Sequence, residues 1–488
     1  MHTPLRPCVG LLSDAFVRDI IDEAFELLAR VGVYVENQEA RALLHGGGAK
    51  VDASSRKAYL TRHLVESALR SAPRQILMYD LTGAKSYVIG DDIVHFDPGS
   101  AALKVFDHRT RSERPATTDD LVRFARLTDA LENFHFQSTG IVSSDVPAEM
   151  ADCYRLYVAL RSCTKPVVTG TFLVEGFKPM RDMLAAARGG SDALKKKPLA
   201  IFDACPSPPL KWSNLTAQSI IDCARAGIPS EFVAMPLAGA TAPATLSGAL
   251  VQHAAENLAG LVITQLASAG APVIFGGSPA IFDMRTATPP MGAIESMMLS
   301  IGYTQIGKML RLPTHGYMGL SDAKCVDAQA GLESAIGTIL AALGGVNVVS
   351  GGGMLDYENC QSLEKLVIDN EICGMAYRLT DGIAQRDERM ALDLFMNLGE
   401  QTDFLTHPHT LEWFRHEQFL PKIIDRENYQ QWVAAAKPEL ADRASEEVKR
   451  ILSAEPHPTL SSEIVRGLED ILMAHARSFG LAKLPPLH

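Results

Sequence analysis

The chain has no apolar run close to the ~18 residues that a membrane-spanning helix needs, which argues against a transmembrane segment. Residues Met1 to Leu12 lack a basic start followed by an apolar core, so no secretory signal is recognised. The eight cysteines form no C-x-x-C pair. These absences predict a cytoplasmic protein whose thiols are reduced.

Basic residues are also scarce relative to acidic ones. Lys and Arg number 46 against 57 Asp and Glu, for a net charge of −11, which argues against a nucleic-acid-binding surface. His407 and His409 are two residues apart, with no cysteine or carboxylate nearby to complete a zinc set. No G-x-S-x-G or Walker loop is present. The sequence therefore predicts no bound metal.

What the chain does have is a regular alternation of short apolar segments and helix-period segments. The expected strands are 93–96, 134–142, 166–172, 199–204, 231–235, 272–275, 315–318 and 346–349. The helices that follow them are expected at 118–131, 149–161, 177–187, 213–226, 245–269, 292–310, 327–343 and 362–379. Eight strands that each lead into a helix favour an α/β fold of the (β/α)₈ TIM-barrel type. A doubly wound open sheet is the alternative, but no G-x-G-x-x-G follows the first strand.

The barrel has additions at both ends of the chain. Residues 1–86 are dominated by helical periodicity and are predicted to form a helical N-terminal cap. The barrel is assigned to residues 87–384. Residues 385–488 are helical and aromatic, and we expect a helical C-terminal extension packed on the barrel.

The stretch from Pro313 to Glu371 organises this pattern. Gly344-Gly345 ends a helix, a short valine-rich strand follows, and Gly351-Gly352-Gly353 forms a loop. Glycine allows a backbone with positive φ and close approach of a ligand. A strand, a helix and a strand of this length make one βαβ unit with parallel strands.

Active residues of a barrel lie on the loops that follow the strands. Here those loops are rich in glycine, proline and small residues and contain few carboxylates or basic groups. This composition predicts contact with a large flat ligand better than acid–base catalysis.

A few side chains near these loops could bind a substrate, and each also has a simpler structural interpretation. Trp212, Tyr317 and Tyr357 could offer aromatic faces to a cation, or fill the core. Phe172 and His315 are more typical of buried positions. Arg285 could bind a carboxylate, or be a solvated surface residue. The glycine loop at 351–353 could hold a phosphate, or be a tight turn.

Taken in order, several motifs resemble the trimethylamine methyltransferase superfamily of corrinoid methyltransferases. They are Leu27-Leu28-Ala29-Arg30-Val31-Gly32-Val33, Asp327-Ala328-Gln329-Ala330-Gly331, Gly352-Gly353-Met354-Leu355-Asp356 and Ser362 to Glu371, with Ser207-Pro208 and the tail residues His409-Thr410. The similarity extends over nearly the whole chain. Each motif alone is weak, and their order is what makes them specific.

The resemblance implies transfer of a methyl group from a methylamine to Co(I) of a separate corrinoid protein. Founding members carry pyrrolysine, whereas all 488 residues here are standard ones. The chain therefore resembles the non-pyrrolysine branch, which acts on quaternary amines such as glycine betaine. Ser207, Gly277, Gly319, Gly351, Gly352 and Gly353 are expected to face the corrinoid of the partner. A homo-oligomer is also expected.

Such chemistry agrees with a rim that is poor in acids and bases. Co(I) is a strong nucleophile, and a quaternary ammonium leaves as a neutral amine, so orientation and desolvation are the main requirements. The alternatives are a methyltransferase for trimethylamine or another methylated amine, a zinc-dependent methyltransferase, and a non-catalytic betaine-binding protein.

Overall fold

The computed structural model describes residues 4–387, 389–399, 403–455 and 459–484. Its centre is a sheet of eight parallel strands in the order β6-β18-β17-β15-β13-β11-β10-β9. These strands are β6 (His95–Pro98), β9 (Gln137–Ser138), β10 (Val167–Gly170), β11 (Ala200–Ala204), β13 (Ser230–Phe232), β15 (Val273–Gly277), β17 (Thr314–Tyr317) and β18 (Val348–Gly352). The sheet closes where the N–H of His135 donates to the carbonyl of Phe96 at 2.9 Å. The predicted barrel is confirmed.

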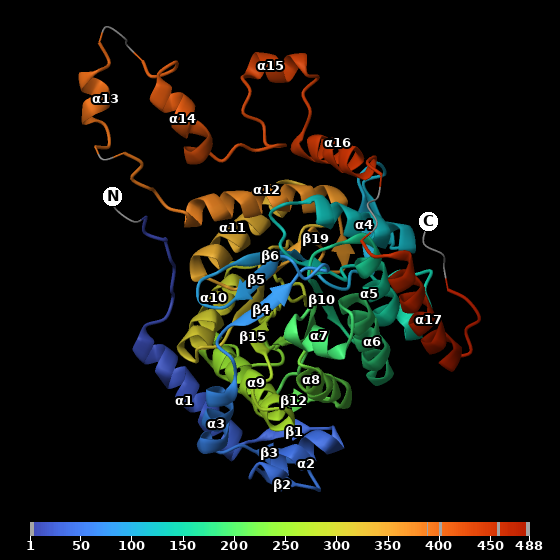
Figure 1. The fold of residues 1–488 in the computed structure, drawn as a ribbon. Helices are drawn as coiled ribbons and strands as arrows, with labels where there is room; N and C mark the ends of the chain where they lie inside the picture. The colour runs from blue at the N-terminus through green and yellow to red at the C-terminus, as the bar shows by residue number, and fades with distance from the viewer. Residues whose placement is uncertain (1–3, 388, 400–402, 456–458, 485–488) are drawn as a thin grey trace.

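A helix follows each strand and packs outside the barrel, and Figure 1 shows these helices as a ring. They are α4 (Thr118–Ala130), α5 (Ala151–Ser162), α6 (Phe177–Arg188), α8 (Asn214–Ala226), α9 (Leu246–Ala267), α10 (Ile294–Met309), α11 (Ala328–Gly344) and α12 (Leu363–Thr380). Side chains cap several of them: Asp327 accepts from Ala330 N, and Ser362 accepts from Lys365 N. Gly345 ends α11 in the left-handed region, with φ of 69°, as a helix-terminating glycine should.

The connections between the barrel strands and helices contain short additional elements. These are β7 (Lys104–Asp107), β8 (Ser112–Pro115), η1 (Ala148–Met150), η2 (Val174–Gly176), α7 (Ser191–Lys196), β12 (Lys211–Trp212), β14 (Leu237–Ala238), β16 (Ala280–Ile281), β19 (Met354–Leu355) and β20 (Cys360–Gln361). One small sheet, in the order β19-β20-β7-β8, joins the loops after the first and last barrel strands.

The interior of the barrel is divided into an apolar half and a polar half. Near the strand starts, Phe136, Val168, Ile201, Ile274 and Val348 form one buried cluster. The hairpin of β4 (Ile76–Tyr79) and β5 (Ser86–Ile89) adds its own buried side chains to this cluster and so plugs that end. Alternate residues of a strand point to the same face. The positions two residues after those of this apolar cluster therefore also point inward, and they form a second layer near the ends of the strands.

The N-terminal segment differs from the helical cap expected at residues 1–86. Its helices α1 (Asp14–Arg30), α2 (Gln38–Gly46) and α3 (Arg62–Ser71) are accompanied by β1 (Val33–Val35), β2 (Lys50–Asp52) and β3 (Lys57–Tyr59). The boundary at residue 86 also cuts the hairpin strand β5. Strands of three residues are too short to show a period, and β1 is completed by parallel pairing with the distant β12.

The C-terminal extension is helical, but only part of it packs on the barrel. Helix α16 (Leu440–Leu452) contacts α12 and α4, and α17 (Ser462–Ser478) contacts α5 and α6. By contrast, α13 (Leu392–Met396), α14 (Pro408–Glu417) and α15 (Tyr429–Ala434) contain no buried residue. Figure 1 shows them outside the ring of helices, beyond α12. Within the described residues, no helix is both long and apolar enough to span a membrane.

Candidate active site

Acidic side chains gather in the polar half of the barrel. Asp97 on β6, Asp203 on β11 and Glu231 on β13 occupy inward positions, and Glu358 reaches in from the loop after β19. Asp97 and Glu231 are 1% and 0% exposed. Asp203 is only partly buried, so this layer is accessible from the mouth.

A short chain of polar contacts links these carboxyls to the neighbouring strands. Ser350 Oγ donates to Asp97 Oδ1 at 2.7 Å and lies 3.1 Å from His315 Nε2. His315 Nε2 is also 3.1 Å from Glu231 Oε1. Glu231 also shares a hydrogen bond with the carboxyl of Asp203. Even so, Asp97 Oδ2, Asp203 Oδ1 and Glu358 Oε1 lack a hydrogen-bond partner. Buried oxygens without partners are costly, which indicates a site shaped for a ligand that is positively charged.

Burial shifts the titration of this cluster toward its neutral forms. It raises the pKa of Asp203 to about 7, although the charge of Arg155 opposes the rise. Burial, followed by the nearby Asp203 and Asp97, raises the pKa of Glu231 well above its usual range. Burial lowers the pKa of His315 to about 3, so its imidazole is neutral at pH 7. A cation that enters the cluster would favour the ionised carboxylates and displace protons.

One arginine also reaches the mouth. Arg155 on α5 is 2% exposed, and its Nη1 donates to the carbonyl of Thr139 at 2.9 Å. Its guanidinium lies 4.4 Å from the ring centroid of Phe172, which follows β10 and is 39% exposed. Arg155 Nε has no hydrogen-bond partner. The pair of Arg155 and Phe172 therefore places a cation beside the acidic cluster.

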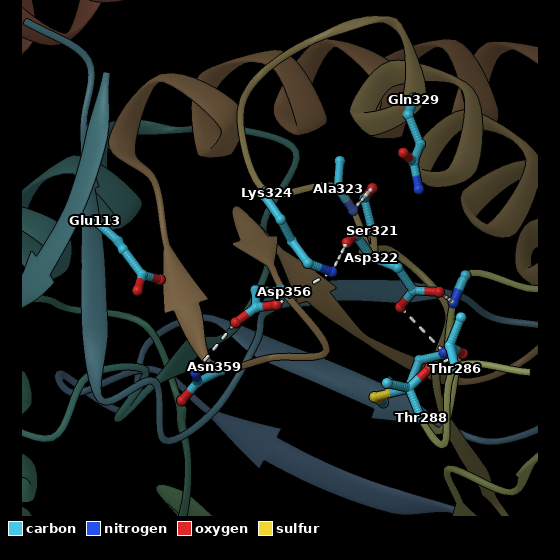
Figure 2. A network of polar contacts seen from close by, with 12 residues as sticks. Glu113, Thr286, Thr288, Ser321, Asp322, Ala323, Lys324, Gln329, Asp356 and Asn359 are labelled. Atoms are coloured by element: carbon cyan, nitrogen blue, oxygen red, sulfur yellow. Dashed lines mark hydrogen bonds and ion pairs between the residues drawn. The ribbon is translucent and has the colours of Figure 1, made fainter. Parts of the chain in front are cut away.

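A lysine holds the loops of the rim together. Lys324 Nζ donates to the carbonyl of Asp322 at 2.6 Å and lies 3.2 Å from Asp356 Oδ1, as Figure 2 shows. The carboxylate of Asp322 accepts from the backbone N–H of Met291 at 3.1 Å and of Gly292 at 2.9 Å. The loops before α10, after β17 and after β19 are thus joined into one polar network.

The loop after β19 has an unusual backbone. Asp356, Tyr357 and Glu358 have φ values of 50°, 55° and 66°, in the left-handed region that residues other than glycine rarely adopt. Lys324 Nζ lies 4.0 Å from the ring centroid of Tyr357 in this loop. Strained backbone is characteristic of functional loops, and here it carries Glu358 to the acidic cluster.

Comparison with known proteins identifies the family and supports the barrel fold. The family model described as trimethylamine methyltransferase (MTTB) matches residues 3–480. The chain belongs to the trimethylamine methyltransferase family. It is 31% identical to trimethylamine methyltransferase MttB of Desulfitobacterium hafniense (strain DSM 10664 / DCB-2), covering 96% of this chain and 95% of that one. It is 30% identical to the glycine betaine methyltransferase of Desulfitobacterium hafniense (strain Y51), covering 98% and 99%.

The solved structures support the fold alone. The crystal structure of the monomethylamine methyltransferase MtmB of Methanosarcina barkeri aligns with a TM-score of 0.56 at 12% identity, covering 97% of this chain and 89% of that one. The resemblance to a methyltransferase family and the TIM-barrel fold are therefore both confirmed.

Two of the expected aromatic residues lie at the mouth of this family member, in surroundings that were not expected. Tyr317 is 7% exposed, and its ring is edge-on to that of His315 at 4.9 Å. It shares an apolar cluster with the partly buried Tyr357. Phe172 and Tyr357 each already face a cation of the chain itself, Arg155 and Lys324 respectively. An aromatic cage with free faces is thus not what the mouth presents.

Trp212 and Arg285 are not brought to the mouth, which corrects the expected pocket. Trp212 is fully buried, edge-on to Phe232, and its Nε1 donates to the carbonyl of Glu256 at 3.1 Å. Position 260 on α9 is a glycine because a Cβ there would lie 2.3 Å from the Trp212 ring. Arg285 has a side chain that is 88% exposed and is paired with Asp283 at 2.7 Å. The simpler structural interpretation holds for both residues.

The residues expected to face a corrinoid are mostly packing positions. A Cβ at Gly277 would lie 2.2 Å from the carbonyl of Ala234, and one at Gly352 would lie 2.5 Å from the Phe134 ring. Gly351 and Gly353 have φ values of 123° and 81°, which a turn requires. Gly319 is buried next to this turn, and Ser207 forms a backbone turn with Lys211. These residues shape the rim, and their contact with a corrinoid stays a prediction.

Sequence reasoning assigned chemistry to the loops, and therefore did not identify the two acidic residues that lie within strands. Asp203 and Glu231 lie within strands that were correctly expected. A barrel strand has both faces covered, so a charged residue in its middle must have a partner or a ligand. That signal was present in the sequence. By contrast, the sequence contains no signal that Arg155 and Glu358 point into the barrel. Their positions depend on the packing of α5 and on the backbone of the loop after β19. Among the described residues, no group of three or more metal-binding side chains is arranged to hold an ion.

Proposed function

We propose that this family member transfers a methyl group from a quaternary amine of the betaine class to Co(I) of a corrinoid protein. The observation that carries the proposal is the cluster of acidic side chains at the barrel mouth, in which Asp97 Oδ2, Asp203 Oδ1 and Glu358 Oε1 lack hydrogen-bond partners. A quaternary ammonium cannot donate hydrogen bonds, so charge is the property by which a protein recognises it.

The carboxyls suit this cation better than they suit general acid catalysis. When the C–N bond breaks, its electron pair stays on nitrogen, and the electron pair of Co(I) forms the new bond to the methyl carbon. The amine leaves neutral, so no proton is needed in this step. The work of Asp203 and Glu231 is to hold the headgroup with one methyl toward the opening and to exclude water.

The Arg155–Phe172 pair supports a substrate that also bears a carboxylate. Arg155 replaces Arg285 as the candidate for this contact, because its Nε has no partner and its side chain is 2% exposed. Guanidinium groups bind carboxylates strongly when both are shielded from water. A betaine would place its cationic end among the acids and its carboxylate at the arginine.

The decisive experiment is a screen of quaternary amines with reduced cob(I)alamin, with methylcobalamin formation as the readout. We expect betaines to react faster than trimethylamine. Methylcobalamin formation from trimethylamine at a rate comparable with every betaine would overturn the betaine assignment. Binding of betaines without any methyl transfer to cob(I)alamin or to corrinoid proteins would favour the non-catalytic alternative.

A second experiment isolates the carboxylate contact. Arg155→Lys should raise KM for a betaine by about tenfold and leave KM for a choline-like amine nearly unchanged, since only the former has a carboxylate to lose. Arg285→Ala is the matched control, and it should change neither value. An equal loss on both substrates would mean that Arg155 positions the acidic cluster instead.

A further inference from the structure

An ion pair is buried in α12, next to the glycine turn that follows the last barrel strand. Lys365 and Asp369 are 1% and 2% exposed, and Lys365 Nζ donates to Asp369 Oδ2 at 2.6 Å. Lys365 Nζ also donates to Ser334 Oγ of α11 at 2.6 Å. The same Oδ2 of Asp369 accepts from the backbone N–H of Gly353 at 2.7 Å. The pair therefore joins two outer helices to the turn after β18.

Stability alone does not require such a pair. Taking two charges out of water costs free energy, and apolar side chains of similar volume often replace a buried ion pair without loss of stability. Apolar side chains could not, however, accept the N–H of Gly353. Gly353 has a φ of 81°, so the chain turns sharply here, and its N–H is bonded to a side chain and not to a neighbouring strand. The specific contribution of the pair is thus a hydrogen bond that fixes this turn.

The turn is the base of a hairpin that reaches the acidic mouth. Strands β19 and β20 pair antiparallel, and the N–H of Ser362, directly after β20, donates to the carbonyl of Gly353 at 2.9 Å. The hairpin carries Glu358, on which the charges of Asp203 and Asp97 act. Glu358 Oε1 has no hydrogen-bond partner. The place of this carboxyl in the acidic cluster therefore depends on the backbone of the hairpin.

We propose that Lys365 and Asp369 are positioning residues for the cation site, because they fix the base of the β19–β20 hairpin and so hold Glu358 in the acidic cluster. This inference rests on the proposed function, since it takes a quaternary ammonium as the ligand of that cluster. A shift of the hairpin would move Glu358 away from its place, and its attraction for the cation falls as the distance between the two charges grows. Both positioning residues lie on α12, outside the barrel, and act through Gly353.

The test separates the hydrogen bond to Gly353 from the ion pair itself. Lys365→Met with Asp369→Leu, the leucine variant, removes the acceptor and leaves no unpaired charge. Lys365→Met with Asp369→Asn, the asparagine variant, also removes both charges but keeps a carbonyl oxygen as acceptor. Glu371→Gln is the control, because Glu371 is likewise buried in α12 but accepts from the backbone N–H of Lys422 in the C-terminal extension. Asp369→Ala in place of Asp369→Leu gives the same test if the leucine variant does not fold.

Two readouts require no methyl acceptor. Calorimetry gives the Kd of tetramethylammonium, the bare headgroup of a quaternary amine, and mass spectrometry follows amide hydrogen exchange over residues 351–361. We expect the leucine variant to bind about tenfold more weakly and to exchange faster over this segment. The asparagine variant and Glu371→Gln should stay within about threefold of the native Kd and show native exchange. In methyl transfer, the leucine variant should raise KM and leave kcat nearly unchanged, because Glu358 attracts the headgroup already in the bound substrate.

A double-mutant cycle tests the route through Glu358. In a Glu358→Gln background, the substitutions of the leucine variant should weaken binding by less than about twofold further. A full tenfold loss in that background overturns the inference, as do equal losses in the leucine and asparagine variants, or native binding and exchange in the leucine variant. Binding and exchange that follow these expectations without any methyl transfer would contradict the proposed function and leave the positioning role intact.

Discussion

Substituting Asp203 by asparagine should lower kcat/KM and raise the free energy of unfolding. A variant that is merely damaged would lose both, so the two opposite changes distinguish the prediction from misfolding. The side chain is partly open to the mouth, and Oδ1 has no hydrogen-bond partner. Burial raises its pKa to about 7. A neutral amide keeps the shape of the carboxyl but cannot attract a quaternary ammonium.

The loss of activity can be estimated from Coulomb attraction. Two opposite unit charges about 5 Å apart interact by roughly 3 kcal/mol at an effective dielectric constant of about 20. Each ~1.4 kcal/mol corresponds to a factor of ten, so kcat/KM for a quaternary amine should fall about 100-fold. In the native chain, kcat/KM should rise with pH through about 7, because the ionised form of Asp203 binds the cation.

Stability should change in the other direction. A carboxyl whose pKa is raised on folding binds more protons in the folded state, so its contribution to the free energy of unfolding decreases as pH rises from about 4. For Asp203, whose folded pKa is about 7, this loss is on the order of 2–4 kcal/mol by pH 8. Asp203→Asn removes that loss, so its Tm should exceed that of the native chain, and the difference should grow with pH.

Glu256→Gln provides the matched control. Burial also raises the pKa of Glu256 to about 7, but this residue lies on α9 and accepts from the backbone N–H of Leu210 at 2.9 Å. Methyl transfer to cob(I)alamin is measured from pH 6 to 8.5, with thermal unfolding of each variant in the same buffers. The reasoning is refuted if Asp203→Asn keeps kcat/KM within threefold of the native value, or if Glu256→Gln loses as much.

Three further outcomes follow from the same contacts. Binding of a quaternary amine at pH 7 should release protons, because the cation lowers the raised pKa values of Asp203 and Glu231; calorimetry in buffers of different ionisation enthalpy would detect this, and a buffer-independent enthalpy would contradict it. Trp212→Leu should lower the free energy of unfolding by about 2–4 kcal/mol through the cavity it leaves, while the folded enzyme keeps its kcat/KM, as measured by chemical denaturation and activity below the transition. Lys324→Met should lower kcat/KM by about tenfold through loosening of the three joined loops, and a variant with native activity and native proteolytic protection of those loops would show that the network is dispensable.

The barrel could be predicted from sequence because its information is local and periodic. Each strand is a short apolar run, and each helix repeats its apolar residues at helical spacing, so the period alone separates the two. Strands β1 to β3 were not predicted, because three residues carry no period. Strand β1 also depends on pairing with β12, which lies far along the chain.

The candidate site was predicted only in its location. The mouth at the strand ends follows from the barrel, and Tyr317 and Tyr357 do lie there. Which side chains offer a free face depends on contacts between distant residues. Arg155 covers one face of Phe172 from a separate helix, and Lys324 covers Tyr357 from another loop. Neither contact is visible in the spacing of residues along the chain.

The arrangement of charges suggests how this family member would separate one cationic substrate from another. Carboxyls attract any cation of suitable size, and a quaternary headgroup offers no hydrogen-bond donors that could refine the choice. Discrimination must then come from the other end of the substrate, where Arg155 lies over the ring of Phe172. Because Arg155 is also drawn to the neighbouring Asp203 and Asp152, a substrate carboxylate has to compete with the protein's own acids. Protonation of the acidic cluster would relieve that competition, so the headgroup and the carboxylate of a betaine favour opposite charge states of Asp203. A betaine should therefore gain less from ionisation of Asp203 than a choline-like amine does, so its kcat/KM should rise less steeply through the pKa of about 7 that burial gives this residue.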